Sequence, residues 1–144
     1  MTDYALRLLM YLAQHPDRLC TIAEVAGAHA ISEAHLMKIT HQLALAGWIE
    51  TVRGKGGGMH LAAPPEAINL GGVVRSMESD FQLVECFGPA NECRITSQCQ
   101  LTSVLQGALD GFLQHLDRHT LADLLPPRPA AVKTRRRTVT IKAG

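Results

Sequence analysis

The architecture of the chain can be read outward from residues 32–62, "SEAHLMKITHQLALAGWIETVRGKGGGMHLA". In the first half, Leu36, Ile39 and Leu43 fall on one face of a helix, and Gly47 is a typical helix stop. In the second half, "WIETV" and "MHLA" alternate apolar and polar residues, which predicts two short strands. The intervening "RGKGGG" holds four glycines and two bases, as expected of a tightly turned or mobile tip. We therefore predict a helix followed by a β-ribbon with a basic, glycine-rich tip.

Two further helices are predicted before this unit. Residues 3–14 repeat apolar side chains at helical spacing. The next segment, "TIAEVAGAHA", begins with Thr21 and has Glu24 three residues later, which is the pattern of a capping box. Ser32 is the expected N-cap of the third helix. Three short helices followed by a ribbon are the layout of a winged helix-turn-helix.

The remainder of the chain predicts a helix over about residues 68–79, a loop without clear periodicity, and a long helix over 101–125. The apolar stripe of the long helix follows a core that is already complete, so we expect a second subunit to cover it. The fold class is thus mainly α with a small β-ribbon, a winged helix-turn-helix plus a long C-terminal dimerisation helix. The predicted domains are a DNA-binding domain at 1–79, a cysteine loop at 80–99, a dimerisation helix at 100–125 and a basic, disordered tail at 126–144.

The composition indicates an ordinary globular protein with one modest domain, or a small domain with an appendage. The chain has 144 residues, of which 47% are hydrophobic and 19% are charged. No apolar run approaches the roughly 18 residues of a membrane helix, and the N-terminus lacks the basic start of a signal peptide. We therefore expect a cytoplasmic protein with no membrane partner. Thiols stay reduced in that compartment, which favours metal-binding or redox roles for clustered cysteines.

The net charge of +1 hides a strong asymmetry. Residues 126–144 contain six Lys and Arg and no acid, so residues 1–125 hold eight bases against 13 acids and have a net charge of −5. Pro126 and Pro127 indicate a break after Leu125. A basic arm of this kind can bind nucleic acid without sequence preference, or it can be a solvated tail.

The helix and the ribbon tip together suggest DNA recognition. A helix fits the major groove, and an Arg-bearing tip can enter the narrow minor groove. Glycine at the tip lets the backbone approach phosphates closely. The alternative is a flexible hairpin with incidental charge, whereas a Walker phosphate loop is excluded because no Gly-Lys-Ser/Thr opens a helix here. The candidate DNA-binding residues are Ser32, Ala34, His35, Lys38, Arg53, Lys55 and Gly56.

Three of the four cysteines, Cys86, Cys93 and Cys99, lie within 14 residues. Six residues separate the first pair and five the second, so the Cys-x2-Cys knuckle of zinc ribbons and the plant-type ferredoxin run are both absent. The spacing alone leaves an iron–sulfur cluster, zinc, and redox or inert thiols open. Cys20 stands apart from the trio and is expected to be a small buried apolar residue.

The combination of "TDYALRLLMYLA", the helix-turn-helix, "VRGKGGGMHLA" and the cysteine trio resembles the Rrf family of bacterial regulators over residues 2–125. The resemblance implies a homodimer that crosses through the long C-terminal helices. It also implies one iron–sulfur cluster in each subunit, held by Cys86, Cys93 and Cys99. For this cofactor [4Fe–4S] is favoured over [2Fe–2S].

The resemblance also bears on the fourth cluster ligand. The IscR branch of the family carries a histidine three residues after the last cysteine, where this chain has Thr102. The NsrR-like branch implies instead an aspartate at the start of the first helix, reaching across from the other subunit. That position is Asp3, for which the alternative role is an acid favoured by the helix dipole. Local alternatives as ligands are Cys20, Glu85, Glu92, His115 and His119.

The expected function is a transcriptional repressor that depends on its cluster. The resemblance implies that the homodimer binds double-stranded operator DNA, senses nitric oxide, and leaves the operator when the cluster is nitrosylated. The alternative is a regulator of the same family that senses iron–sulfur supply or redox state, as in the IscR branch. An enzyme is not expected, because the sequence has no Ser/His/Asp set and no second cluster motif.

Overall fold

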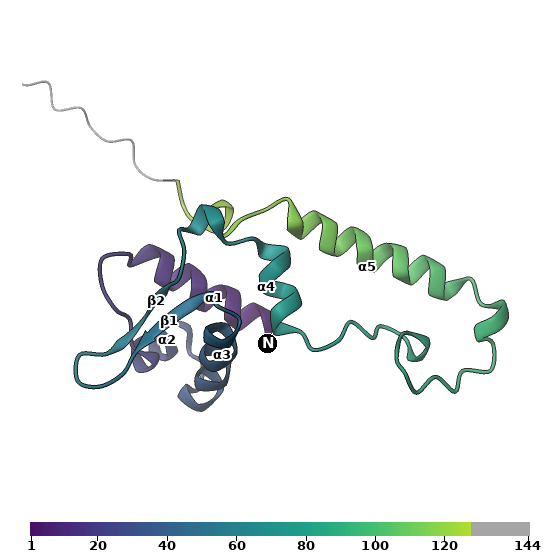
Figure 1. Cartoon of the computed structure of the whole chain (residues 1–144), viewed down its shortest axis with the longest axis horizontal. Coiled ribbons are helices and arrows are strands. Elements are labelled where there is room, and N and C mark those ends of the chain that lie inside the picture. Colours follow the sequence, from purple (N-terminus) through teal and green to yellow (C-terminus); the bar gives the residue numbers. More distant parts are fainter. Residues whose placement is uncertain (128–144) are drawn as a thin grey trace, which may run out of the picture.

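The computed structural model describes residues 1–127 and contains the three predicted helices followed by the ribbon (Figure 1). Four short 3-10 turns join or follow the main elements, at Pro65–Ala67, Glu85–Phe87, Thr96–Gln98 and Leu121–Leu124. The helices and strands are α1 (Thr2–Gln14), α2 (Ile22–His29), α3 (Glu33–Leu45), β1 (Ile49–Val52), β2 (Gly58–Leu61), α4 (Leu70–Met77) and α5 (Leu101–Asp117).

The helix boundaries follow the predicted capping residues. The side chain of Thr21 accepts a hydrogen bond from the backbone N–H of Glu24, and the Glu24 carboxylate accepts one from the backbone N–H of Thr21, which confirms the capping box. The Ser32 hydroxyl accepts from the N–H of His35 over 3.2 Å and caps α3. Gly47, with φ of +81°, turns the chain out of α3 into β1.

The ribbon is an antiparallel pair in which Ile49 faces Leu61 and Val52 faces Gly58. Its turn requires glycine, because a Cβ at Gly57 would lie 2.2 Å from the carbonyl oxygen of Val52. A third backbone segment also joins the ribbon. Cys20 exchanges two backbone hydrogen bonds with Met59, over 3.0 and 2.8 Å, so the segment before α2 lies at the outer edge of β2.

The core lies between the helices α1 to α4 and the inner face of the ribbon. Cys20 is fully buried there, as expected for a small apolar residue. Trp48 connects the ribbon to α4, because its indole N–H donates to the Ser76 hydroxyl over 2.9 Å and its ring packs against Gly72. The fully buried large side chains are Leu8, Leu9, Val25, Leu36, Ile39, Leu43, Met59, Ile68, Val73 and Leu121.

The predicted long helix ends earlier than expected. A helix over 101–125 is wrong, since α5 stops at Asp117 and the chain then turns back onto the body. Thr120 and Asp123 form a capping box that starts a new 3-10 turn, and this turn places Leu121 in the core. Of the predicted basic tail, residues 128–144 lie outside the described part of the chain.

The segment 78–100 and α5 extend to one side of the body (Figure 1). None of the α5 side chains is buried, and Leu101, Val104 and Phe112 are more than half exposed. A 17-residue helix with this apolar surface is unusual unless another surface covers it. Among residues 1–127, no helix has the length and apolar character needed to cross a membrane.

Candidate metal centre and DNA interface

The N-terminal turns of α3 carry the first group of candidate DNA-binding residues. Ser32, Ala34 and Lys38 are exposed. His35 is half buried, because its ring packs edge-on against Tyr4 of α1 with the ring centroids 5.3 Å apart. His35 therefore presents only part of its surface to a ligand, whereas the other three are exposed.

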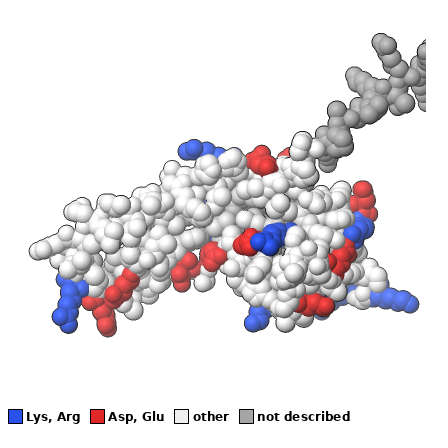
Figure 2. Space-filling model, turned by 180° about the vertical axis from the view of Figure 1, so that it is seen from behind, with Lys and Arg blue, Asp and Glu red and all other residues white. Residues whose placement is uncertain are grey.

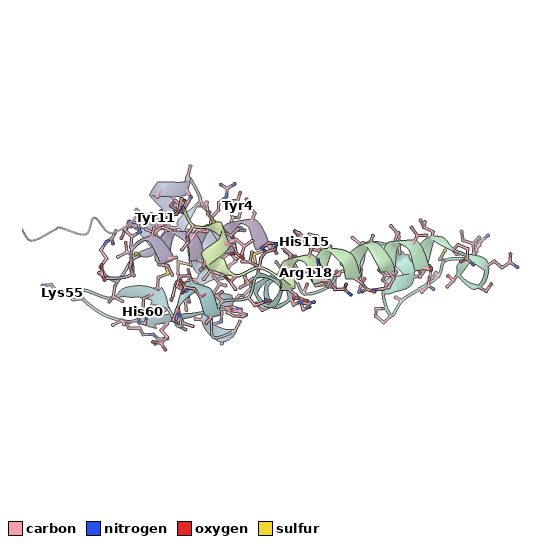
Figure 3. The ribbon with its side chains drawn as sticks, turned by 90° about the horizontal axis from the view of Figure 1, so that it is seen from above. Tyr4, Tyr11, Lys55, His60, His115 and Arg118 are labelled. Atoms are coloured by element: carbon pink, nitrogen blue, oxygen red, sulfur yellow. The ribbon has the colours of Figure 1, made fainter. Side chains whose placement is uncertain are left out.

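The ribbon tip carries the second group. Arg53, Lys55 and Gly56 are exposed, and Figure 3 shows Lys55 at the far end of the ribbon, away from α5. The left-handed backbone at Gly56, with φ of +77°, is a conformation that glycine adopts without strain. The tip thus presents two cations on a turn where the backbone itself is uncovered.

The three clustered cysteines are free and half buried in the segment between α4 and α5. Cys86 lies in the turn Glu85–Phe87, and Cys99 lies two residues before the start of α5. These two cysteines line the same depression, of about 900 Å³, together with Phe81, Phe87 and Thr102. Cys93 is not among the residues that line it.

Thr102, in the first turn of α5, contacts both of these thiols. Its hydroxyl lies 3.0 Å from the sulfur of Cys86. The backbone N–H groups of Thr102 and Leu101 and the Thr102 hydroxyl all stabilise the thiolate of Cys99, so the pKa of Cys99 is lowered despite its partial desolvation. The sequence singled out Thr102 only for not being histidine, and its role beside both sulfurs was missed.

Asp3 is exposed at the start of α1 and is paired within its own chain. Its carboxylate contacts Arg7 one turn later, with Oδ2 3.0 Å from Nη2 and Oδ1 3.1 Å from Nε. The side chain of Asp3 is 68% exposed, so the pair is open to solvent and to exchange for another partner.

Three of the local alternatives for a fourth ligand, Cys20, Glu85 and His119, are buried or engaged elsewhere. Cys20 is buried in the core, and the Glu85 carboxylate accepts from the backbone N–H of Glu92 over 2.7 Å. His119 contacts Asp123 over 3.2 Å, and its ring lies 5.0 Å from that of His115. Within residues 1–127, no three His, Cys, Asp or Glu side chains are grouped closely enough to hold a metal ion.

The donor chemistry of the cysteine segment fits an iron–sulfur cluster, although the three sulfurs are not brought together. All three thiols are unpaired, and one of them has its thiolate form stabilised by the start of a helix. None of the core side chains comes from residues 78–120, so little packing fixes the segment in one conformation. Its shape can therefore adapt to a bound group.

Comparison with known proteins identifies the family. A family model named Rrf2 and described as "Iron-dependent Transcriptional regulator" matches residues 1–127. The chain belongs to the Rrf2 family. It is 45% identical to the HTH-type transcriptional regulator NsrR of Bacillus subtilis, over 92% of both chains. It is also 47% identical to the regulator of the same name from Halalkalibacterium halodurans, over 86% of both chains.

A solved structure agrees with this membership. The structure of T. potens IscR superposes with a TM-score of 0.68 at 26% sequence identity, and the match covers 85% of this chain and 81% of that one. Membership of the Rrf2 family confirms the predicted resemblance and the winged-helix fold. The protein is a transcriptional regulator and not an enzyme.

Proposed function

We propose that this Rrf2 protein is a cytoplasmic homodimeric repressor that releases its operator when an iron–sulfur cluster reacts with nitric oxide. The observation that carries the proposal is the placement of Cys86 and Cys99 around one depression, with Thr102 beside both sulfurs. The relatives named NsrR support the assignment to a branch of the family. The choice of nitric oxide as the signal rests on the resemblance to these relatives.

The proposed ligands are Cys86, Cys93 and Cys99 of one subunit and Asp3 of the partner subunit. A [4Fe–4S] cluster is favoured over [2Fe–2S], and either supplies iron atoms to which nitric oxide can bind. A carboxylate is a harder and weaker ligand for such a cluster than a thiolate. The exposure of Asp3 and its solvent-open pair with Arg7 support this role, because the carboxylate can leave Arg7 at little energetic cost.

The cysteine segment joins two elements that are themselves tied together. It begins after α4 at Glu78, whose carboxylate accepts from the backbone N–H of Thr2 over 3.1 Å. It ends at α5, whose last residue, Asp117, pairs with Arg75 of α4 over 2.9 Å. A change in the segment would thus act on the N-terminal end of α5 while the other end stays fixed to the body.

The dimer would form through the exposed apolar surface of α5, which includes Leu101, Val104 and Phe112. Two copies of α3 could then meet successive half-sites about 34 Å apart, one helical turn of DNA. We propose a matching division of the chain into residues 1–79 for DNA binding, 80–99 for the cluster, and α5 for dimerisation. The DNA contacts would come from the exposed residues of α3 and the ribbon tip.

The difference in operator-binding free energy that the proposed switch requires is modest. Moving the protein from nearly all bound to nearly all free requires about 5 kcal/mol of difference in affinity between the two states. Two cysteine segments, one in each subunit, would contribute to this difference. Each needs to change the free energy of operator binding by about half of that value.

The test is operator binding by anaerobically purified protein before and after addition of nitric oxide. We expect tight binding before addition and loss of at least a hundredfold in affinity afterwards. Equal affinities would rule out nitric-oxide sensing. If affinity instead follows cluster assembly or air oxidation and is insensitive to nitric oxide, the protein senses iron–sulfur supply or redox state.

A further inference from the structure

Met37 is a large apolar side chain that is left exposed on α3. It is 58% exposed, and among residues 1–127 it is neither a core residue nor one of the partly buried side chains that pack against the core. The exposed apolar residues of α5, such as Val104 and Phe112, have a proposed cover in the partner subunit. Met37 lies on a different element, so that interface does not account for its exposure.

α3 is the second helix of the helix-turn-helix, which is the helix that enters the major groove in this class of protein. Ala30, with a left-handed φ of +53°, turns the chain out of α2, and Ser32 then caps α3. Figure 1 shows α2 and α3 together at one edge of the body, on the side away from the turn Leu121–Leu124. The exposed face of α3 is thus open to DNA.

One continuous stripe of exposed residues runs along α3 and consists of Ala34, Met37, Lys38 and His41. These residues are three or four positions apart, so they span only about 100° of the helix circumference. The opposite side of the helix carries its buried residues, Leu36, Ile39, Thr40 and Leu43. Because Ala34 and Lys38 are predicted DNA-binding residues, Met37 belongs to the same surface.

The part of the stripe formed by Ala34 and Met37 is apolar. A long side chain on a helix leans toward the helix N-terminus, so Met37 covers the surface beside Ala34, one turn earlier. Ala34 has only a methyl side chain, which leaves room for a close approach. The first turns of a recognition helix are the part that contacts base edges. Met37 and Ala34 thus place an apolar surface where base edges would lie.

Charge alone cannot decide which DNA sequence is bound. Lys and Arg stand singly on the face shown in Figure 2, and most of that face is uncharged. Within the stripe on α3, only Lys38 is a formal cation when histidine is neutral. Contacts from such cations to phosphates position a protein on the duplex but carry no sequence information. Sequence discrimination therefore depends on the side chains that contact base edges.

The major groove presents one methyl group, the C5 methyl of thymine, among hydrogen-bond donors and acceptors. An apolar side chain gains free energy by excluding water from a methyl group, whereas it leaves a donor or acceptor unpaired. Removal of one methyl group from such a contact lowers affinity by about three- to tenfold. The apolar surface of Met37 and Ala34 therefore favours thymine.

We propose that Met37, together with Ala34, determines operator sequence by contacting the C5 methyl of one thymine in each half-site. The inference rests on the proposed function only in requiring that the dimer binds an operator through α3. It does not depend on the cluster ligands or on nitric oxide. Lys38 and His41 remain available for phosphates or for the polar edges of adjacent bases.

The test begins with selection of the operator from a random pool of duplex DNA by the full-length, anaerobically purified protein. Each thymine of the selected site is then replaced by uracil in both half-sites, which removes the C5 methyl and retains base pairing. We expect one position at which wild-type affinity falls about tenfold or more, as the product of two half-site losses. Met37→Ala should bind the thymine operator and this uracil operator with equal affinity.

Leu45→Ala is the matched control, because Leu45 is 75% exposed on the same helix but lies in its last turn. This variant should keep the preference for thymine. Met37→Leu should keep it as well, since leucine retains an apolar side chain of similar size. Urea midpoints of all three variants should equal that of the wild type, because neither position is in the core.

Wild-type affinity that is unchanged by uracil at every position would overturn the proposal. So would a Met37→Ala variant that still prefers thymine at the sensitive position, or an equal loss of that preference in Leu45→Ala. An enriched operator without a methyl effect leaves the regulatory proposal intact, whereas a selection that enriches no sequence contradicts both proposals. The response of wild-type operator binding to nitric oxide is measured separately and has no bearing on the preference for thymine.

Discussion

The backbone N–H of Leu121 donates to the carbonyl oxygen of Ile68 over 2.8 Å, and this bond returns the segment after α5 to the winged-helix body. The contact is reinforced by a hydrogen bond from the N–H of Leu70 to the carbonyl oxygen of His119 over 3.0 Å. The side chain of Leu121 is fully buried in the same place. The last described turn is thus part of the core, although α5 before it is not.

Leu121→Ala should destabilise the protein by about 2 to 5 kcal/mol, because it leaves a cavity in a packed core. The measurement is urea unfolding followed by circular dichroism. Leu124→Ala, three residues later at a position that is 36% exposed, is the matched control and should have a much smaller effect. Similar losses for both variants would mean that Leu121 is not a core residue.

Gly57→Ala should disrupt the ribbon turn and weaken DNA binding, because the added Cβ would lie 2.2 Å from the carbonyl oxygen of Val52. Operator binding is expected to fall at least tenfold while visible absorption of the metal centre is unchanged. Gly107→Ala in α5 is the control, since a Cβ there meets no atom within 4 Å and should stabilise the helix by about 0.5 to 1 kcal/mol. Unchanged operator affinity in Gly57→Ala would show that the turn is not part of the DNA interface.

The lowered pKa of Glu24 predicts that the stability of the protein changes with pH in the acid range. Arg18 and then Tyr11, whose hydroxyl lies 2.8 Å from the carboxylate, lower the pKa of Glu24 to about 2. A depressed carboxylate pKa contributes stability that is present above the ordinary value near 4.5 and is lost as the pH falls toward 2. We therefore expect the stability difference between wild type and Glu24→Gln to shrink across that range, as measured by urea midpoints at several pH values.

The control for this pH dependence is Glu66→Gln, at an exposed position in the turn Pro65–Ala67. Its difference from wild type should be small throughout. A Glu24→Gln difference that stays constant between pH 5 and pH 2.5 would contradict the assignment of the lowered pKa to this carboxylate.

Replacement of Cys86, Cys93 or Cys99 by Ser should remove the visible absorption of the anaerobically purified protein. Cys20→Ala is the matched control, because that thiol is fully buried in the core and takes no part in the proposed centre. The control should keep its absorption and lose some stability. A centre that survives loss of any one of the three clustered cysteines would exclude that residue as a ligand.

Asp3→Asn should leave the protein folded and yield a metal centre that is lost faster to chelators. The side chain of Asp3 is 68% exposed, so its replacement has little direct effect on folding. Arg7→Gln is the control that breaks the same ion pair without touching the proposed ligand. If both variants lose the centre at the wild-type rate, the partner subunit's Asp3 is not a ligand.

Much of the fold could be predicted because it is encoded locally. The capping residues Thr21 and Ser32 and the helix stop at Gly47 act within one or two turns, and each is found in its predicted role. The return of Leu121 was missed because the apolar spacing of residues 101–125 continues through it. The Thr120–Asp123 capping box was the available signal for a break in that helix.

The site was harder to predict, because its contacts join residues that are distant in sequence. The pairing of Cys20 with Met59 and the placement of Thr102 beside Cys86 depend on tertiary structure that no local pattern specifies. The cysteine spacing alone left a cluster, zinc and redox or inert thiols open, and the family resemblance is what predicts cysteine ligands for a cluster. Their assembly into one centre stays a prediction, since the described residues do not group three donors.

The separation of the core from the cysteine segment has a consequence for how such regulators diversify. Because none of the core side chains lies in the segment between α4 and α5, substitutions in that segment have little direct effect on folding. If this segment holds the proposed cluster, substitutions there can alter the signal to which the regulator responds while the winged helix-turn-helix keeps its shape. One ancestral promoter-binding regulator could in this way give rise to descendants that respond to different stresses.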